Sequence, residues 1–232
     1  METTGGVKEQ SFFELIYGIL FNPVKTFRNV SEMPPFGQAA AILFFIALSD
    51  GLVGFFVFRS TLADIPGINA MVSVPVITGL FGFILLFTLV LAGLRWFLYG
   101  SLLHLLAELW GGKGTPKGTL TVYALAGLPG VFLAPLQLIL ALLRVSEITS
   151  AVLSITAGLV VLTWGIVLLV LGLREIHRFS SGAAVLTVIT PAAIILILTG
   201  VFIAVLFALV GAVTPLFPPA TRPGGLSCPI SL

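Results

Sequence analysis

Residues 151–173 read AVLSITAGLVVLTWGIVLLVLGL and contain no charged side chain. At about 1.5 Å per residue, a helix over this stretch is long enough to cross the ~30 Å hydrocarbon core of a bilayer. Four other apolar runs have the same character. The expected spans are residues 36–58, 75–109, 120–143, 151–173 and 183–213. The sequence therefore predicts an all-α, polytopic membrane protein with five transmembrane helices.

The composition points the same way and argues against several other classes of protein. Of the 232 residues, 58% are hydrophobic and 9% are charged, whereas soluble domains have about a quarter charged residues. The net charge of +2 is too small and too scattered for a nucleic-acid footprint. The single cysteine, Cys228, excludes an intramolecular disulfide and a multi-cysteine zinc site. The lipid bilayer is therefore the expected partner of most of the surface.

The expected organisation is one five-span domain over residues 11–213, between a flexible N-terminus (1–10) and a Pro/Gly-rich tail (214–232). The N-terminus carries charged residues and no short apolar stretch ending in a small-residue cleavage site, so the first span is expected to direct insertion. Ser11–Val30 is apolar but interrupted by polar residues, which predicts an interfacial amphipathic helix. A helix packed under the bundle is the open alternative.

Lys and Arg are unevenly divided between the two ends of the spans. One side holds seven: Lys8, Lys25, Arg28, Lys113, Lys117, Arg174 and Arg178. The other side holds three: Arg59, Arg144 and Arg222. Because positive residues are retained on the cytoplasmic side during insertion, we expect a cytoplasmic N-terminus and an outside C-terminus.

Three segments carry a family resemblance. Residues 21–28 (FNPVKTFR), 102–115 (LLHLLAELWGGKGT) and 123–129 (YALAGLP) resemble, in order and spacing, motifs of the YIP (Ypt/Rab-interacting protein) domain family. The resemblance covers about residues 12–210 and implies a five-helix membrane domain with a cytoplasmic N-terminus. Eukaryotic members are associated with Rab-type GTPases and early secretory traffic. The short segment before the first span and the missing "DLYGP"-like stretch instead indicate a compact prokaryotic-type member of a cell membrane.

Asp50 and Arg95 fall deep inside expected spans, where an ionised side chain costs roughly 2.5–3.5 kcal/mol on insertion scales. Counted from inner boundaries at Gln38 and Glu108, Asp50 lies about 18 Å and Arg95 about 20 Å deep at ~1.5 Å per residue. At these depths the two form a candidate intramembrane ion pair. If the second helix leaves the core near Tyr99, Arg95 instead lies near the interface and snorkels.

A candidate polar cluster lies at the cytoplasmic ends of the spans. Its members are Ser101, His104, Glu108, Lys113, Arg174, Glu175, His177 and Arg178. The spacing of Ser101, His104 and Glu108 places them on one helix face. One reading is a proton relay, or half of a metal site completed by His177 and Glu175. The favoured reading pairs Glu108 with a nearby cation, so we expect no metal site.

The loop at residues 111–118 reads GGKGTPKG. It lacks the G-x-x-x-x-G-K-[ST] spacing and the preceding strand of a phosphate loop. The sequence therefore predicts a flexible hinge between two spans, with lysines attracted to anionic headgroups.

Two further patterns concern helix shape. The third span contains a candidate helix break at Gly127, Pro129, Gly130 and Pro135, the kind of interruption that transporters use at binding sites but that also occurs as a simple kink. The fourth span repeats small residues every seven positions, at Ala151, Gly158, Gly165 and Gly172. Such a smooth face allows another helix to approach closely, and we favour a contact within the subunit.

The inventory of catalytic motifs is thin, with no H-E-x-x-H pair, no G-x-S-x-G elbow and no cysteine in a span. We expect no enzyme activity and no cofactor. The leading hypothesis is a membrane protein that organises or modulates the bilayer or a partner complex, with another membrane protein or a second copy as partner. The alternative is a small transporter or channel component whose path is lined by Asp50, Arg95 and the broken third helix.

Overall fold

A computed structural model of the chain describes residues 11–63 and 74–213, and within these ranges the regular structure is helical. Five helices are long and apolar enough to span a membrane, so the predicted five-span, all-helical class is confirmed. The elements are α1 (Phe12–Phe21), α2 (Pro23–Glu32), α3 (Phe36–Ala63), α5 (Val74–Leu109), α6 (Pro116–Ala126), η1 (Leu128–Phe132), α7 (Leu133–Leu142), α8 (Glu147–His177) and α9 (Ser181–Val213). The expected N-terminus, the expected tail and Cys228 lie outside the described residues.

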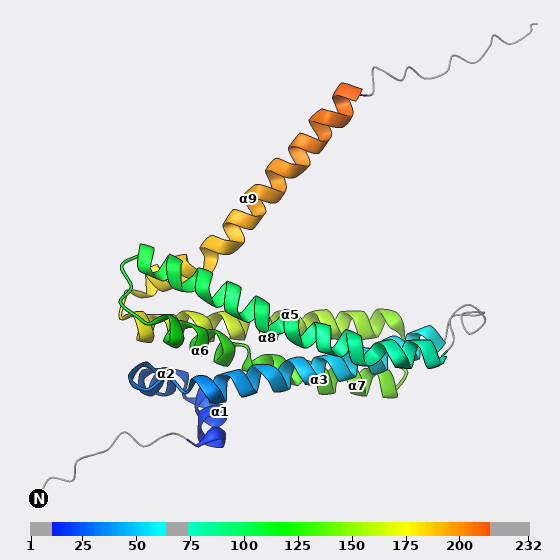
Figure 1. Ribbon diagram of the computed structural model, residues 1–232, viewed down its shortest axis with the longest axis horizontal. Helices are drawn as coiled ribbons and strands as arrows, with labels where there is room; N and C mark the ends of the chain where they lie inside the picture. Colours follow the sequence, from blue (N-terminus) through cyan, green and yellow to red (C-terminus); the bar gives the residue numbers. More distant parts are fainter. Residues whose placement is uncertain (1–10, 64–73, 214–232) are drawn as a thin grey trace, which may run out of the picture. The chain divides into compact units, whose positions relative to one another are not determined.

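The chain divides into two compact units, Met1–Ile189 and Thr190–Leu232. The boundary falls inside α9, between Ile189 and Thr190, directly before Pro191 and its preceding residue. The candidate residues all belong to the first unit, whose helices are coloured blue to yellow in Figure 1.

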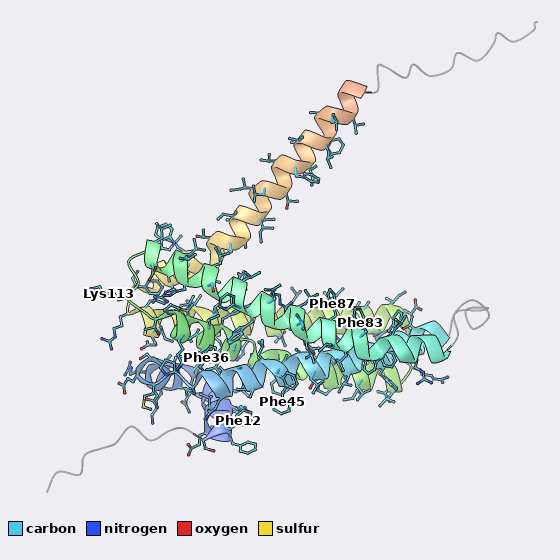
Figure 2. All side chains as sticks on the ribbon, viewed as in Figure 1. Phe12, Phe36, Phe45, Phe83, Phe87 and Lys113 are labelled. Carbon is cyan, nitrogen blue, oxygen red and sulfur yellow. The ribbon has the colours of Figure 1, made fainter. Side chains whose placement is uncertain are left out.

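The third span is the central element of the first unit. It is built from α6, η1 and α7, and it contacts both α3 and α8, while α6 also contacts α5 (Figure 1). In its most apolar window 33% of the residues are buried, against 6% for α3 and 0% for α5. Most side chains of α3 and α5 are therefore exposed, among them Phe45 on α3 and Phe83 and Phe87 on α5, which are labelled in Figure 2.

The helices α3 and α5 pack antiparallel. The ring of Phe36, at the start of α3, lies 5.3 Å from that of Trp96, and the ring of Phe55 lies 3.9 Å from that of Phe81. The indole N–H of Trp96 also donates to the Leu120 carbonyl of α6 at 2.9 Å. These contacts fix the register of α5, which continues for thirteen residues beyond Trp96 to Leu109 and so passes the level at which α3 begins.

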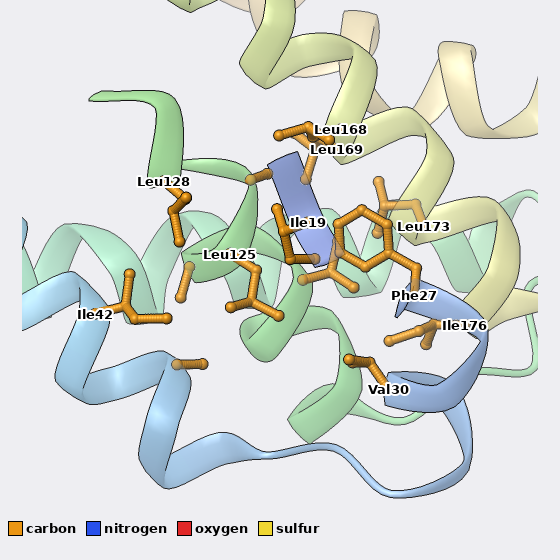
Figure 3. Close-up of a cluster of buried hydrophobic side chains, with 14 of the residues drawn as sticks. Ile19, Phe27, Val30, Ile42, Leu125, Leu128, Leu168, Leu169, Leu173 and Ile176 are labelled. Carbon is orange, nitrogen blue, oxygen red and sulfur yellow. The ribbon is translucent and has the colours of Figure 1, made fainter. Parts of the chain in front are cut away.

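The N-terminal stretch forms two helices rather than one, because Pro23 lacks an N–H and occupies the first turn of α2. Both helices dock on the bundle. Leu15 and Ile19 of α1 are fully buried, and Phe27 of α2 points toward Leu173 of α8 in Figure 3. The opposite side of α1 exposes an aromatic row, Phe13, Tyr17 and Phe21, at 79%, 61% and 66%. The helix α1 therefore packs on the bundle with one face and exposes an apolar face on the other. Each of the two expected arrangements included one of these features.

The small residues of α8 divide into two groups. A Cβ on Gly172 would lie 2.5 Å from Val122 Cγ1 and 3.1 Å from Phe27 Cε1, and a Cβ on Gly165 would lie 3.2 Å from the Ala126 carbonyl oxygen. By contrast, a Cβ on Gly158 would meet nothing within 4 Å, and Ala151 is exposed. Close approach within the subunit is therefore limited to the half of α8 that lies against α2 and α6.

Replacing Gly172 with alanine is expected to destabilise the protein, because the added methyl overlaps Val122 in a packed core. Overpacking of this kind costs about 1–3 kcal/mol. Gly158→Ala is the matched control, and it should be neutral or stabilising by up to about 1 kcal/mol through helix propensity. Unfolding in detergent followed by circular dichroism measures both. Equal effects at the two positions would contradict the close packing of α8 on α6.

Candidate functional site

The loop after α5 begins with a helix cap built from two glycines. Gly111 has a φ of +84°, which an L side chain rarely adopts. Its N–H donates to the Glu108 carbonyl at 2.9 Å, and the Gly112 N–H donates to the Ala107 carbonyl at 2.8 Å. This pair of bonds is the Schellman pattern that ends many helices. The first half of GGKG therefore turns the chain out of α5.

The rest of the loop closes on His177, the last residue of α8. The Lys113 N–H donates to the His177 carbonyl at 3.1 Å, and the Gly114 N–H donates to His177 Nδ1 at 3.1 Å. A Cβ on Gly112 or on Gly114 would lie 2.6 or 2.8 Å from Nδ1, so both positions require glycine. The loop expected to be a flexible hinge is instead tied to His177, which is fully buried.

His177 starts a chain of polar contacts toward the outside. Because its Nδ1 accepts from Gly114, the ring proton of the neutral imidazole lies on Nε2, which donates to Thr119 Oγ1 at 2.8 Å. The Thr119 hydroxyl has two acceptors, His104 Nδ1 at 3.3 Å and the Thr115 carbonyl at 3.2 Å. His104 Nε2 in turn lies 3.3 Å from Glu108 Oε1. The contacts thus run from the half-buried Gly114 amide to the half-exposed Glu108 carboxylate.

This geometry differs from the favoured sequence reading of the cluster. Glu108 meets His104, and the described residues show no ion pair within 4.0 Å between Glu108 and Lys113, Arg174 or Arg178. Of these three, Arg174 is half-buried, whereas Lys113 and Arg178 are exposed, and Lys113 can be seen on the loop in Figure 2. Ser101 is half-buried one turn before His104.

Glu175 forms a second centre beside this chain. Its Oε1 accepts from Arg174 at 2.8 Å, and its Oε2 lies 3.6 Å from Arg28 Nε on α2. Glu175 is therefore held by arginines rather than by the histidines. Within the described ranges, no group of three or more His, Cys, Asp or Glu side chains is placed to hold a metal ion.

Sequence reasoning missed three members of this region. Thr119 joins the two histidines, Gly114 supplies the amide that fixes the ring of His177, and Arg28 links α2 to α8. The signal for Thr119 was its place one turn after Thr115, which caps α6 by accepting from the Gly118 N–H at 3.1 Å. That spacing places Thr119 on the same side of α6 as Thr115, and tertiary packing brings this side against His177.

The candidate intramembrane pair lies elsewhere. Asp50 and Arg95 are both exposed on the surface of the chain, and within the described residues they form no ion pair within 4.0 Å. Their direct pairing stays a prediction.

The third span is interrupted at the candidate break. Gly127 ends α6, Pro129 and Gly130 lie in the 3-10 turn η1, and Pro135 lies in the first turn of α7. Leu128 and Pro129 are buried. The backbone of α8 comes close to the Ala126 carbonyl oxygen at Gly165. Packing against α8 therefore fills one side of the interruption.

Replacing Thr119 with valine tests the chain of contacts. The change keeps the shape of the side chain but removes the hydroxyl, leaving a buried histidine N–H without its acceptor, at a cost of about 1–3 kcal/mol. Thr121→Val is the matched control, because Thr121 is equally buried and its hydroxyl donates only to the Lys117 carbonyl, at 2.8 Å. Thermal unfolding in detergent should show the larger loss for Thr119→Val. Equal losses would mean that Thr119 does not connect the histidines.

Comparison with known protein families gives one match. A family model described as Yip1 domain matches residues 17–203, a range that extends from α1 into α9 and includes the site. The match confirms the resemblance expected from the three motifs. No curated protein and no solved structure matches the chain.

Proposed function

Since this chain belongs to the Yip1 domain family, we propose that it is a non-enzymatic membrane protein that organises the bilayer or a partner complex through its cytoplasmic end. The observation that carries the proposal is the docking of α1 and α2. Their inner residues are part of the core, whereas Phe13, Tyr17 and Phe21 form an outward aromatic row. A fixed apolar row beside exposed cations suits contact with a partner or with the membrane surface.

The orientation with a cytoplasmic N-terminus is part of this proposal. Arg28 of α2 lies beside Glu175 near the end of α8, and the loop carrying Lys113 is bonded to His177. Three separately positive segments therefore meet at one end of the first unit. The charge rule for insertion assigns such an end to the cytoplasm.

The test is capture of the intact assembly. The tagged protein is purified from native membranes in mild detergent, and its mass is measured beside that of a triple variant, Phe13→Ser, Tyr17→Ser and Phe21→Ser. We expect a stoichiometric partner or membrane-dependent assembly that the triple variant loses. The control, Phe83→Leu with Phe87→Leu, alters exposed aromatic residues on α5 and should retain it. A lone chain that carries a small molecule or ion, unaffected by the triple variant, would contradict the proposal.

A small transporter or channel component is the second candidate, favoured by the interruption of the third span and by a carboxylate, Asp50, inside the first. Under this candidate, Asp50→Asn should abolish a measurable ion or solute flux in proteoliposomes while leaving thermal unfolding unchanged. Under the organising function, the same change should affect only stability. Asp50→Glu, which keeps the charge, is the control.

A further inference from the structure

One face of α5 carries an open groove of about 370 Å³, away from the polar cluster. Its lining residues are Leu91, Leu94, Arg95, Leu98, Tyr99 and Leu102. The four leucines are 40–57% exposed, so the groove lies on the outside of the first unit. The groove surface is almost wholly apolar, and Arg95 is the charged residue among those that line it.

Arg95 lacks a contacting anion among the described residues. The facing pairs Phe36–Trp96 and Phe55–Phe81 place Asp50 opposite about residue 86 of α5. Nine residues then separate that level from Arg95, which corresponds to about 14 Å at ~1.5 Å per residue. The two side chains form no ion pair within 4.0 Å in the described residues, so the Arg95 guanidinium is available to an external anion.

Arg95 lies close to the level at which the first span begins. Its neighbour Trp96 contacts Phe36, which is the first residue of the first span. A long arginine side chain at that level extends to the interface while its stem stays on apolar surface. This placement matches the interfacial alternative that the sequence left open for Arg95.

We propose that this groove binds an anionic phospholipid of the cytoplasmic leaflet. The lipid phosphate meets Arg95, and an acyl chain lies along the leucines. A guanidinium binds phosphate through paired, charge-assisted hydrogen bonds, and the apolar walls suit the chain. A phospholipid supplies both features in one molecule. A two-fold dimer that joins the same groove in two copies would bring Arg95 close to its equivalent at the same depth, and like charges disfavour that occupant.

The experiment measures lipid selectivity. Purified protein is delipidated in detergent and exposed to equal amounts of phosphatidylglycerol and phosphatidylcholine, and the retained lipids are counted by native mass spectrometry. We expect a preference for phosphatidylglycerol that falls about tenfold in Arg95→Gln. Arg59→Gln removes an exposed cation near the opposite end of α3 and should keep the preference. Leu94→Trp keeps the charge but fills the groove, and it should reduce retention of the lipid.

Several outcomes would overturn the proposal. One is an unchanged preference in Arg95→Gln, and another is an equal loss in Arg59→Gln, which would assign the effect to general surface charge. Competition by inorganic phosphate as strong as that by lipid would show that the acyl chain contributes nothing. A dimer or a protein partner that is lost in Arg95→Gln, without a change in lipid, would identify a different occupant. None of these results bears on the aromatic row of α1, so this proposal can fail independently of the proposed function.

Discussion

Replacing His177 with leucine is expected to loosen the cytoplasmic end of the bundle more than any other change at the site. His177 is fully buried, and its ring nitrogens meet the Gly114 N–H at 3.1 Å and Thr119 Oγ1 at 2.8 Å. Leucine removes the partner of both groups. The loss at the buried Thr119 costs about 1–3 kcal/mol, and the loss at the half-buried Gly114 N–H adds to it. Unfolding in detergent measures the total loss, and limited proteolysis of the loop at residues 111–115 measures its release.

Two conservative variants separate the contributions. The side-chain oxygen of asparagine can take the place of Nδ1, so His177→Asn should keep the bond from Gly114 and lose the contact with Thr119. Glutamine reaches further, so His177→Gln should show the opposite pattern. If His177→Asn loses the contact with Thr119, adding Thr119→Val to that variant should lower its stability little further. The two changes would then remove the same interaction. Fully additive losses would show that the ring does not join the loop to α6.

The sequence predicted part of this site because helix periodicity is informative over one turn. The spacing of His104 and Glu108 placed them on one face, and they lie 3.3 Å apart. The partners contributed by other segments were not accessible in the same way. Thr119 and Gly114 reach His177 through tertiary packing, and a glycine that is required for close approach has the same sequence signature as a glycine in a flexible hinge.

The fold was predictable at the level of spans but not of faces. The apolar runs gave the five helices because backbone groups in lipid must satisfy their hydrogen bonds internally. Which side of each helix packs could not be derived, since lipid-facing and core-facing residues are both apolar. For the same reason, α1 could be assigned either to the interface or to the bundle. The small residues of α8 predicted close packing, and Gly172 does pack closely. The same seven-residue period also included Gly158, where an added Cβ would meet nothing within 4 Å.

Replacing Phe27 with alanine is expected to detach α2. Phe27 is fully buried and lies among residues of α6 and α8, including Leu173 (Figure 3). Removing a buried phenylalanine ring costs about 3–5 kcal/mol, which is a large share of the stability of a small domain. Phe13→Ala is the control, because Phe13 is 79% exposed and should change the free energy of unfolding by less than about 0.5 kcal/mol.

The loss at Phe27 should appear first as local opening, because α2 is a short helix at the edge of the bundle and contacts chiefly α1 and α8. Protease sensitivity within residues 22–33 should therefore rise before the spans unfold. A double variant makes the argument stricter. A Cβ at position 172 would lie 3.1 Å from the Phe27 ring, so Gly172→Ala should cost less in the Phe27→Ala background than alone. Unchanged protease sensitivity, together with strict additivity, would mean that α2 is not held on α8 by this ring, and the aromatic row of α1 would then lack the fixed base that the proposed function requires.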